Sequence, residues 1–187
     1  MSDKFEGKYH EGVIELDTDC SYFDHSELFG RFVCTSGAEN HLAPTGTVED
    51  LKEAVVKLPV YMMVHSSTRI NPESFGCPFD SWQWGFICAS DKEIRAYFDL
   101  KEDDYIDDFK VKKELLASIA IVDSFLSGEV YSYTVTNKLS GEAVDMLGGI
   151  TTYEDAKHQL DEAIKIADKE YEEREFPLLV VTGTLED

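Results

Sequence analysis

The sequence predicts an α+β fold with a mainly antiparallel sheet of about five to seven strands and helices packed mostly on one face. Two short apolar runs, residues 60–64 and 82–89, have the composition of strands buried on both faces. Residues 130–137 alternate apolar and polar side chains, as a half-exposed strand does. Because 187 residues fit one domain, we expect a single α+β domain over residues 1–187, with residues 1–10 flexible.

In the first half of the chain, residues 12–18 and 28–34 predict two strands, and Gly30 marks a bulge or a close backbone approach within the second. Thr47 followed by Asp50 predicts the start of a helix that Pro59 ends. The two apolar runs follow as the centre of the sheet. Trp82, Trp84 and Phe86 alternate, so we expect all three on one face of that sheet, packed against a helix.

In the second half, residues 91–97 predict a short capped helix, and residues 107–127 a longer one with Gly128 as its C-terminal stop. Residues 130–137 and 142–146 predict a hairpin, after which Gly148 and Gly149 punctuate the chain. Thr151 with Glu154 has the spacing of a capping box and opens a helix to about residue 174. Pro177 begins a predicted last strand.

The charge balance is the most informative part of the composition: 38 Asp and Glu against 17 Lys and Arg give a net charge of −21. Such a chain is repelled by nucleic acids and anionic membranes and attracted to basic surfaces. No segment is long and apolar enough to span a membrane, and the polar start does not resemble a secretory signal, so we expect a cytoplasmic protein. The expected partner is a basic protein; the oligomeric state stays open.

The cysteines and histidines do not predict a metal site or a cofactor. The four cysteines are widely spaced, and the histidines are scattered. These residues are Cys20, Cys34, Cys77, Cys88, His10, His25, His41, His65 and His158. Because zinc sites need closely spaced ligand pairs, we interpret the cysteines as small buried hydrophobic residues.

Three blocks of the chain resemble a family of small acidic proteins from phages, plasmids and other mobile elements. The blocks are residues 19–34, ending FGRFVC; residues 58–95, with GCPFDSWQWGFICASDKEIR; and residues 126–149, with LSGEVYSYTV and SGEAVDMLGG. Met146 and Leu147 depart from the pattern, in place of a more polar segment that contains an aromatic residue. The family has no established activity, so no functional residue is carried over. The resemblance implies a mobile-element origin and favours an accessory or anti-defence role.

On this basis the leading hypothesis is an inhibitor that imitates DNA. Carboxylates spaced over a loop and a helix can imitate phosphates, and a host restriction enzyme or CRISPR effector would then bind the protein in place of DNA. The candidate partner-binding residues are Glu102, Asp103, Asp104, Asp107 and Asp108 in one segment, and Asp155, Asp161, Glu162, Asp168, Glu172 and Glu173 on the outer face of the last helix. The competing interpretation is that these carboxylates only keep the protein soluble.

A second hypothesis, from a different class, is a small hydrolase or a ligand-sequestering protein with a pocket near His65, Cys77 and Asp80. The spacing of these residues matches no known nucleophile or phosphate-binding motif. Residues 77–81 are explained more simply as a tight turn in which Asp80 and Ser81 bond backbone amides and Phe79 packs inward. We therefore favour binding over catalysis.

Overall fold

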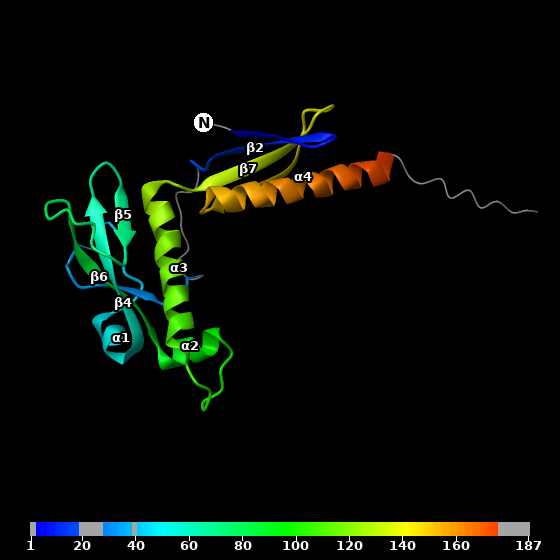
Figure 1. Ribbon diagram of the computed structural model, residues 1–187. Helices are drawn as coiled ribbons and strands as arrows, with labels where there is room; N and C mark the ends of the chain where they lie inside the picture. Colours follow the sequence, from blue (N-terminus) through cyan, green and yellow to red (C-terminus); the bar gives the residue numbers. More distant parts are fainter. Residues whose placement is uncertain (1–2, 19–27, 39–40, 176–187) are drawn as a thin grey trace, which may run out of the picture. The chain divides into compact units, whose positions relative to one another are not determined.

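The computed structural model describes residues 3–18, 28–38 and 41–175 (Figure 1). The chain divides into two compact units: unit 1 consists of Met1–Cys20 and Val130–Asp187, and unit 2 of Ser21–Glu129. Both units contain a four-stranded antiparallel sheet and at least one helix, which confirms the α+β class. The strands form two sheets and not the one sheet that we expected. The organisation as a single domain stays a prediction.

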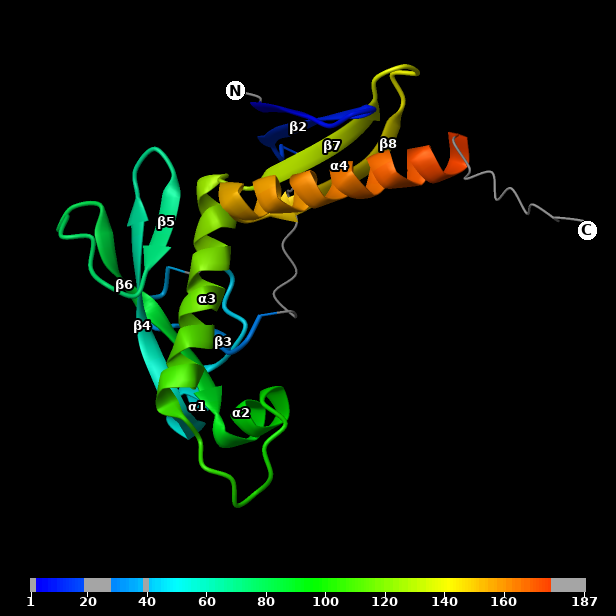
Figure 2. The same ribbon diagram turned by 45° about the vertical axis from the view of Figure 1, so that its right-hand side comes forward.

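Unit 1 is a four-stranded sheet covered by one long helix (Figures 1 and 2). The strand order is β1 (Asp3–Glu6), β2 (His10–Leu16), β7 (Tyr131–Asn137) and β8 (Ala143–Ile150), and the helix is α4 (Tyr153–Glu175). Tyr133 and Val135 of β7 are buried against α4, as the alternation in residues 130–137 predicts. The core of unit 1 consists of Ile14, Tyr133, Val135, Ile150, Ala156, Leu160, Ala163 and Ile164.

Three details of unit 1 differ from the prediction. Helix α4 is capped by Thr152, whose hydroxyl accepts the N–H of Asp155 (3.1 Å), so the capping pair lies one residue later than Thr151 and Glu154. Residues 148–149 do not end the strand but lie in β8, where the register with β7 shifts at a bulge. Residues 3–6, in the segment expected to be flexible, form β1 and pair with β2. The predicted last strand lies outside the described residues.

Asp168 fastens α4 to the start of β2. Its carboxylate accepts hydrogen bonds from the backbone N–H groups of residues 8–10 (2.5–3.0 Å) and lies 2.8 Å from Nδ1 of the buried His10. Burial acts to raise the pKa of Asp168, but the hydrogen bonds from His10 and the backbone outweigh it and hold that pKa below its ordinary value. Asp168 therefore lies on the inner side of α4 and, contrary to the prediction, is not part of the outward acidic surface.

Unit 2 contains the predicted sheet centre (Figures 1 and 2). The strand order is β3 (Arg31–Cys34), β6 (Ser81–Ser90), β4 (Ala54–Val64) and β5 (Thr68–Asn71). The helices are α1 (Val48–Glu53), α2 (Asp91–Tyr97) and α3 (Asp108–Ser127). The apolar runs thus form the adjacent strands β4 and β6, as predicted, and α3 buries Leu115, Ile119 and Val122 in the same core. Gly128, at φ 75°, ends α3 as expected.

Helix α1 begins at the predicted cap but is much shorter than predicted. Thr47 and Asp50 form the capping box, yet the helix ends at Glu53, and β4 begins at Ala54. Pro59 therefore lies within a strand. It pairs with Phe86 of β6, while β5 pairs with β4 only from Tyr61 onward, so one edge of β4 is open at Pro59. A proline is tolerated at such an edge because no ladder hydrogen bond needs its missing N–H.

The packing in and around β6 decides the outcome of the predictions for Trp84, Phe86 and Gly30. Trp84 is fully buried and its indole N–H donates to the carbonyl of Ala38 (2.8 Å). Phe86 does not share this face as predicted, because a register shift between β4 and β6 changes the alternation and Ile87 continues the core instead. At Gly30, where φ is 86°, a Cβ would lie 2.4 Å from a side-chain carbon of Leu115, so the predicted close approach is confirmed.

Asp123 on α3 fastens this helix to β5. Its carboxylate accepts the backbone N–H of Ile70 (2.7 Å) and binds the guanidinium of Arg69 through both oxygens (2.7 and 3.0 Å). This bond raises the pKa of Arg69 above its ordinary value. In each unit, one aspartate of the long helix thus holds a segment of the sheet by accepting backbone and side-chain donors together.

We predict that Asp168→Ala lowers the free energy of unfolding of unit 1 by about 3 kcal/mol, because it leaves several donors without an acceptor. Asp161→Ala, on the same helix, should change it by less than about 0.5 kcal/mol. Both tryptophans belong to unit 2, so hydrogen exchange of the α4 amides, and not tryptophan fluorescence, is the suitable measurement. Equal effects of the two substitutions would show that Asp168 does not hold α4 in place.

Candidate functional site

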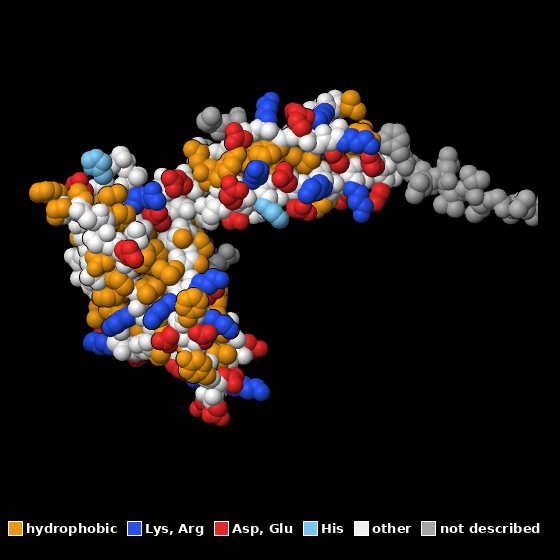
Figure 3. All heavy atoms as spheres, viewed as in Figure 1, with side chains coloured by type: hydrophobic (Ala, Val, Ile, Leu, Met, Phe, Trp, Pro, Cys, Tyr) orange, Lys and Arg blue, Asp and Glu red, His pale blue; other side chains and the backbone are white. Residues whose placement is uncertain are grey.

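The acidic segment predicted from the sequence is the exposed connection between α2 and α3, followed by the first turn of α3. We call residues 99–109, which include Asp108 and Phe109 of α3, the acidic loop. Its exposed carboxylates belong to Asp99, Glu102, Asp103, Asp104 and Asp108. Asp99 has a positive φ of 53°, which Asp tolerates better than most residues. The loop is visible at the lower end of unit 2 in Figure 1, and Figure 3 shows acidic and hydrophobic side chains there, with some basic ones beside them.

The acidic loop is held from beneath by apolar and polar contacts. Leu100 and Ile106 pack against the core of unit 2. The backbone N–H of Lys101 donates to the carboxylate of Asp104 (2.7 Å), and Arg95 of α2 donates to the carbonyls of Lys101 and Asp104. These contacts fix the backbone of the loop, so the outward carboxylates are attached to a backbone of defined shape.

Two aromatic rings stand among these carboxylates. The side chains of Tyr105 and Phe109 are 86% and 77% exposed, whereas most large apolar residues of unit 2 are buried. Tyr105 borders a small cavity of about 150 Å³ that Leu100 and Val111 also line. Large exposed rings on a fixed backbone are typical of the residues that dominate protein interfaces. The acidic loop therefore combines charge with two apolar anchors.

The five carboxylates predicted in this segment have different roles. Asp107 is the N-cap of α3 and accepts the N–H groups of Phe109 (3.0 Å) and Lys110 (3.4 Å). Asp104 closes the turn described above. Glu102, Asp103 and Asp108 are exposed and free for a partner. Beside the loop, burial and a hydrogen bond to Glu114 raise the pKa of Tyr97 above its ordinary value.

The carboxylates predicted on α4 do not form an uninterrupted acidic surface. Glu162 pairs with Lys165 (2.8 Å), Glu173 lies 3.8 Å from Lys169, and Glu172 pairs with Lys8. Asp155 belongs to the N-terminal cap, and Asp161 is half-buried. In Figure 3, basic side chains lie between acidic ones along this helix. The acidic loop is thus the better candidate for a phosphate-like surface.

The structure brings His65, Cys77 and Asp80 together, but in an order unsuited to catalysis. The Asp80 carboxylate lies 3.8 Å from Sγ of Cys77 and 3.5 Å from Nδ1 of His65. The carboxylate therefore stands where a nucleophilic thiol would need the imidazole base. The side chain of His65 is 75% exposed, which leaves it in water and not in a pocket.

Residues 77–81 form the turn that the sequence predicts. Ser81 donates to the carbonyl of Cys77 and the Asp80 carboxylate lies near Cys77 Sγ, so within the described residues neither side chain bonds a backbone amide as expected. The carbonyl of Asp80 accepts the N–H of Val64 (3.0 Å). Phe79 does not pack inward as expected but is 91% exposed at the tip. These contacts favour a structural turn over an active site.

Cys88 is a buried thiol as predicted, and burial raises its pKa to about 11. Cys34 and Cys77 are only partly buried, contrary to the prediction, and Cys20 lies outside the described residues.

Among the described residues, no group of three or more His, Cys, Asp or Glu side chains is arranged to hold a metal ion. No helix in the described ranges has the length and apolarity required to cross a bilayer.

Asp99, Tyr105 and Phe109 belong to the candidate site but were not among the residues predicted from the sequence. The signal for the two rings was present, because both stand inside a run of charged residues, whereas the exposure of Phe109 depends on how α3 packs.

We predict that Asp107→Ala lowers the stability of unit 2 by about 1 kcal/mol, because α3 loses its N-cap. Asp103→Ala, four residues earlier in the same loop, should change stability by less than about 0.5 kcal/mol. Urea unfolding followed by fluorescence of Trp82 and Trp84, which lie in the same unit, measures both effects. A large loss of stability for Asp103→Ala would contradict the assignment of this carboxylate to a free surface.

Comparison with known proteins adds no family to this description. The chain matches no family model, no curated protein and no solved structure. The resemblance to small acidic proteins of mobile elements therefore stays a prediction, and the function is argued from the acidic loop and its surroundings.

Proposed function

We propose that this protein acts by binding, and that the acidic loop occupies a basic surface of a nucleic-acid-binding protein in place of DNA. The observation that supports this most is the set of exposed carboxylates on a backbone fixed by Leu100, Ile106 and Arg95. A fixed array of negative charges costs less conformational entropy on binding than a mobile one.

The charge of the whole chain supports the same proposal. Unit 1 has 7 Lys and Arg against 19 Asp and Glu, and unit 2 has 10 against 19, so both units are strongly negative. Among the 17 Lys and Arg, all within the described ranges, nine form ion pairs inside the protein. The resulting field repels nucleic acid and accelerates association with a basic protein.

Tyr105 and Phe109 add apolar contact area, which carboxylates alone do not provide. Exposed carboxylates steer the protein toward basic surfaces and speed association, but solvent-exposed charge pairs by themselves add little affinity. Two exposed rings beside the carboxylates can enter apolar hollows of one partner and slow dissociation from it. We therefore propose that the protein inhibits a specific target and is not a polyanion that binds any basic surface.

The identity of the partner follows from the sequence resemblance. If the chain comes from a phage or another mobile element, the basic protein it would need to inhibit is a host defence protein of the restriction or CRISPR type. Such enzymes bind DNA through basic channels, which suits an acidic competitor.

We predict that the protein inhibits DNA cleavage by a susceptible restriction enzyme or CRISPR effector, and that the Glu102→Lys/Asp103→Lys double variant inhibits at least tenfold less. Binding should weaken steeply as salt rises, and an excess of uncleavable duplex DNA should displace the protein. The Glu154→Lys/Asp161→Lys variant makes the same change of charge on α4 and should inhibit as the wild type does.

Two results would contradict this prediction. If duplex DNA does not compete, the protein acts at a surface other than the DNA-binding one. If the loop and α4 variants lose inhibition equally, net charge and not the acidic loop is responsible.

We further predict that Tyr105→Ser and Phe109→Ser each weaken inhibition by about thirtyfold while binding keeps its dependence on salt, because each removes an apolar anchor and no charge. Leu139→Ser is the matched control, since Leu139 is 82% exposed but belongs to the turn between β7 and β8. Unchanged inhibition by both ring variants would leave charge as the only determinant of binding.

A further inference from the structure

Unit 1 has an open sheet edge next to a groove. β8 pairs with β7 on one side, and no other strand of the described residues pairs with its second side. Residues 143–149 of β8 are all exposed, and they include the apolar Val144, Met146 and Leu147. An exposed apolar edge strand presents backbone donors and acceptors to any extended segment of suitable register.

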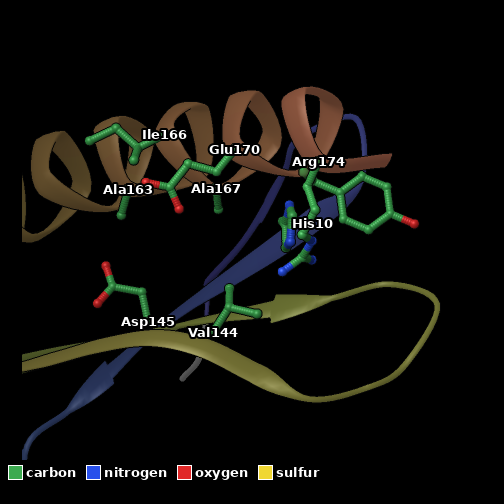
Figure 4. Close-up of a pocket in the computed structure, with 9 residues that line it drawn as sticks. His10, Val144, Asp145, Ala163, Ile166, Ala167, Glu170 and Arg174 are labelled. Atoms are coloured by element: carbon green, nitrogen blue, oxygen red, sulfur yellow. The ribbon is translucent and has the colours of Figure 1, made fainter. Parts of the chain in front are cut away.

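The groove lies between β8 and α4 and has a volume of about 500 Å³ (Figure 4). Its apolar lining includes Val144, Ala163 and Ile166, and His10 of β2 lies at its inner end. The small side chains on α4 leave room for an incoming apolar side chain. This volume is within the range of typical ligand pockets.

A bulge in β8 opens the groove. Asp145 pairs with Val135 and Ala143 pairs with Thr136, so Val144 is an extra residue on β8. As a result both Val144 and Asp145 line the groove, although neighbouring residues of a regular strand point to opposite faces. Bulges that redirect side chains in this way are common next to binding sites.

We propose that β8 and α4 bind an extended segment of a basic protein, which adds to the edge of the sheet. This inference rests on the proposed function in one respect, namely that the partner is basic. Asp145 and Glu170 line the groove and would attract a Lys or Arg of the segment, while the apolar lining takes one aliphatic side chain. Arg174, which also lines the groove, lies 3.5 Å from Glu175 and is partly neutralised by it.

Charge separates this occupant from a second copy of the chain. Two copies joined at β8 would bring together molecules of net charge −21, with unit 1 alone strongly negative. Like-charge repulsion of this size opposes self-association, whereas an extended basic segment is attracted. Recognition of this kind, with backbone bonds at a strand edge and side-chain pockets beside it, is a recurring mode of peptide binding.

The test uses an eight-residue capped peptide with a fluorescent label, Val-Thr-Lys-Thr repeated twice, in which Val and Lys alternate along one face of the extended chain. We expect it to bind the full chain and to slow the hydrogen exchange of the β8 amides. A peptide with Gly in place of Val has the same charge and should bind at least tenfold more weakly, because it has no apolar side chain for the groove. A peptide with Glu in place of Lys should not bind.

Variants of α4 and β8 decide whether binding occurs in the groove. Glu170→Lys should weaken binding about tenfold. Asp161→Lys is its control, because residues nine apart lie on opposite sides of a helix, and it should have little effect. Val144→Ser should weaken binding, and Leu139→Ser should not. The Glu102→Lys/Asp103→Lys variant should bind the peptide as the wild type does.

Four outcomes would overturn the inference. They are a peptide that does not bind, β8 amides that stay unprotected, equal losses for Glu170→Lys and Asp161→Lys, and tighter binding after removal of residues 176–187. The last would mean that the chain's own C-terminal segment occupies the groove. Any of these leaves the inhibition assay of the acidic loop unaffected, so failure of the groove and failure of the proposed function are distinguishable.

Discussion

Both units depend on an aspartate that fastens a long helix to a sheet. Asp168 of α4 accepts the backbone N–H groups at the start of β2, and Asp123 of α3 accepts the N–H of Ile70 in β5. Each carboxylate is largely buried and also has a cationic or imidazole donor, Arg69 or His10. Because a buried carboxylate without donors is very unfavourable, these bonds fix where each helix lies on its sheet.

The same constraint shapes the outer surface. Arg31, for example, binds Asp50 (3.0 Å) and Glu93, which ties β3 to the starts of α1 and α2. Arg95 similarly donates a hydrogen bond to the carbonyl of Asp104 in the acidic loop. Nine of the 17 Lys and Arg are paired in this way, and Lys101 is the only basic residue among residues 99–109. The negative field that we propose attracts a partner therefore reflects the excess of carboxylates in the acidic loop.

Acidic residues in this chain consequently have three different roles. Asp168 and Asp123 hold elements together, Asp107 caps α3, and Glu102 and Asp103 face outward. Composition does not distinguish these roles, because the residue type is the same in each. One signal for Asp168 was nevertheless present in the sequence: it follows the buried Leu160 and Ile164 at a spacing of four, which places it on the inner face of α4.

The sequence by itself determined the α+β class, the strands at the centre of unit 2, and the extent of helix α3 with its stop at Gly128, whereas the capping role of Asp107 came from the structure. These features depend on local periodicity and capping, which residue order specifies directly. Only the tertiary structure decided that the strands form two sheets, that α1 ends at Glu53 where β4 begins, and that Tyr105 and Phe109 stay exposed. Pairing and burial depend on contacts between residues far apart in the chain, and local pattern does not record which of those contacts form.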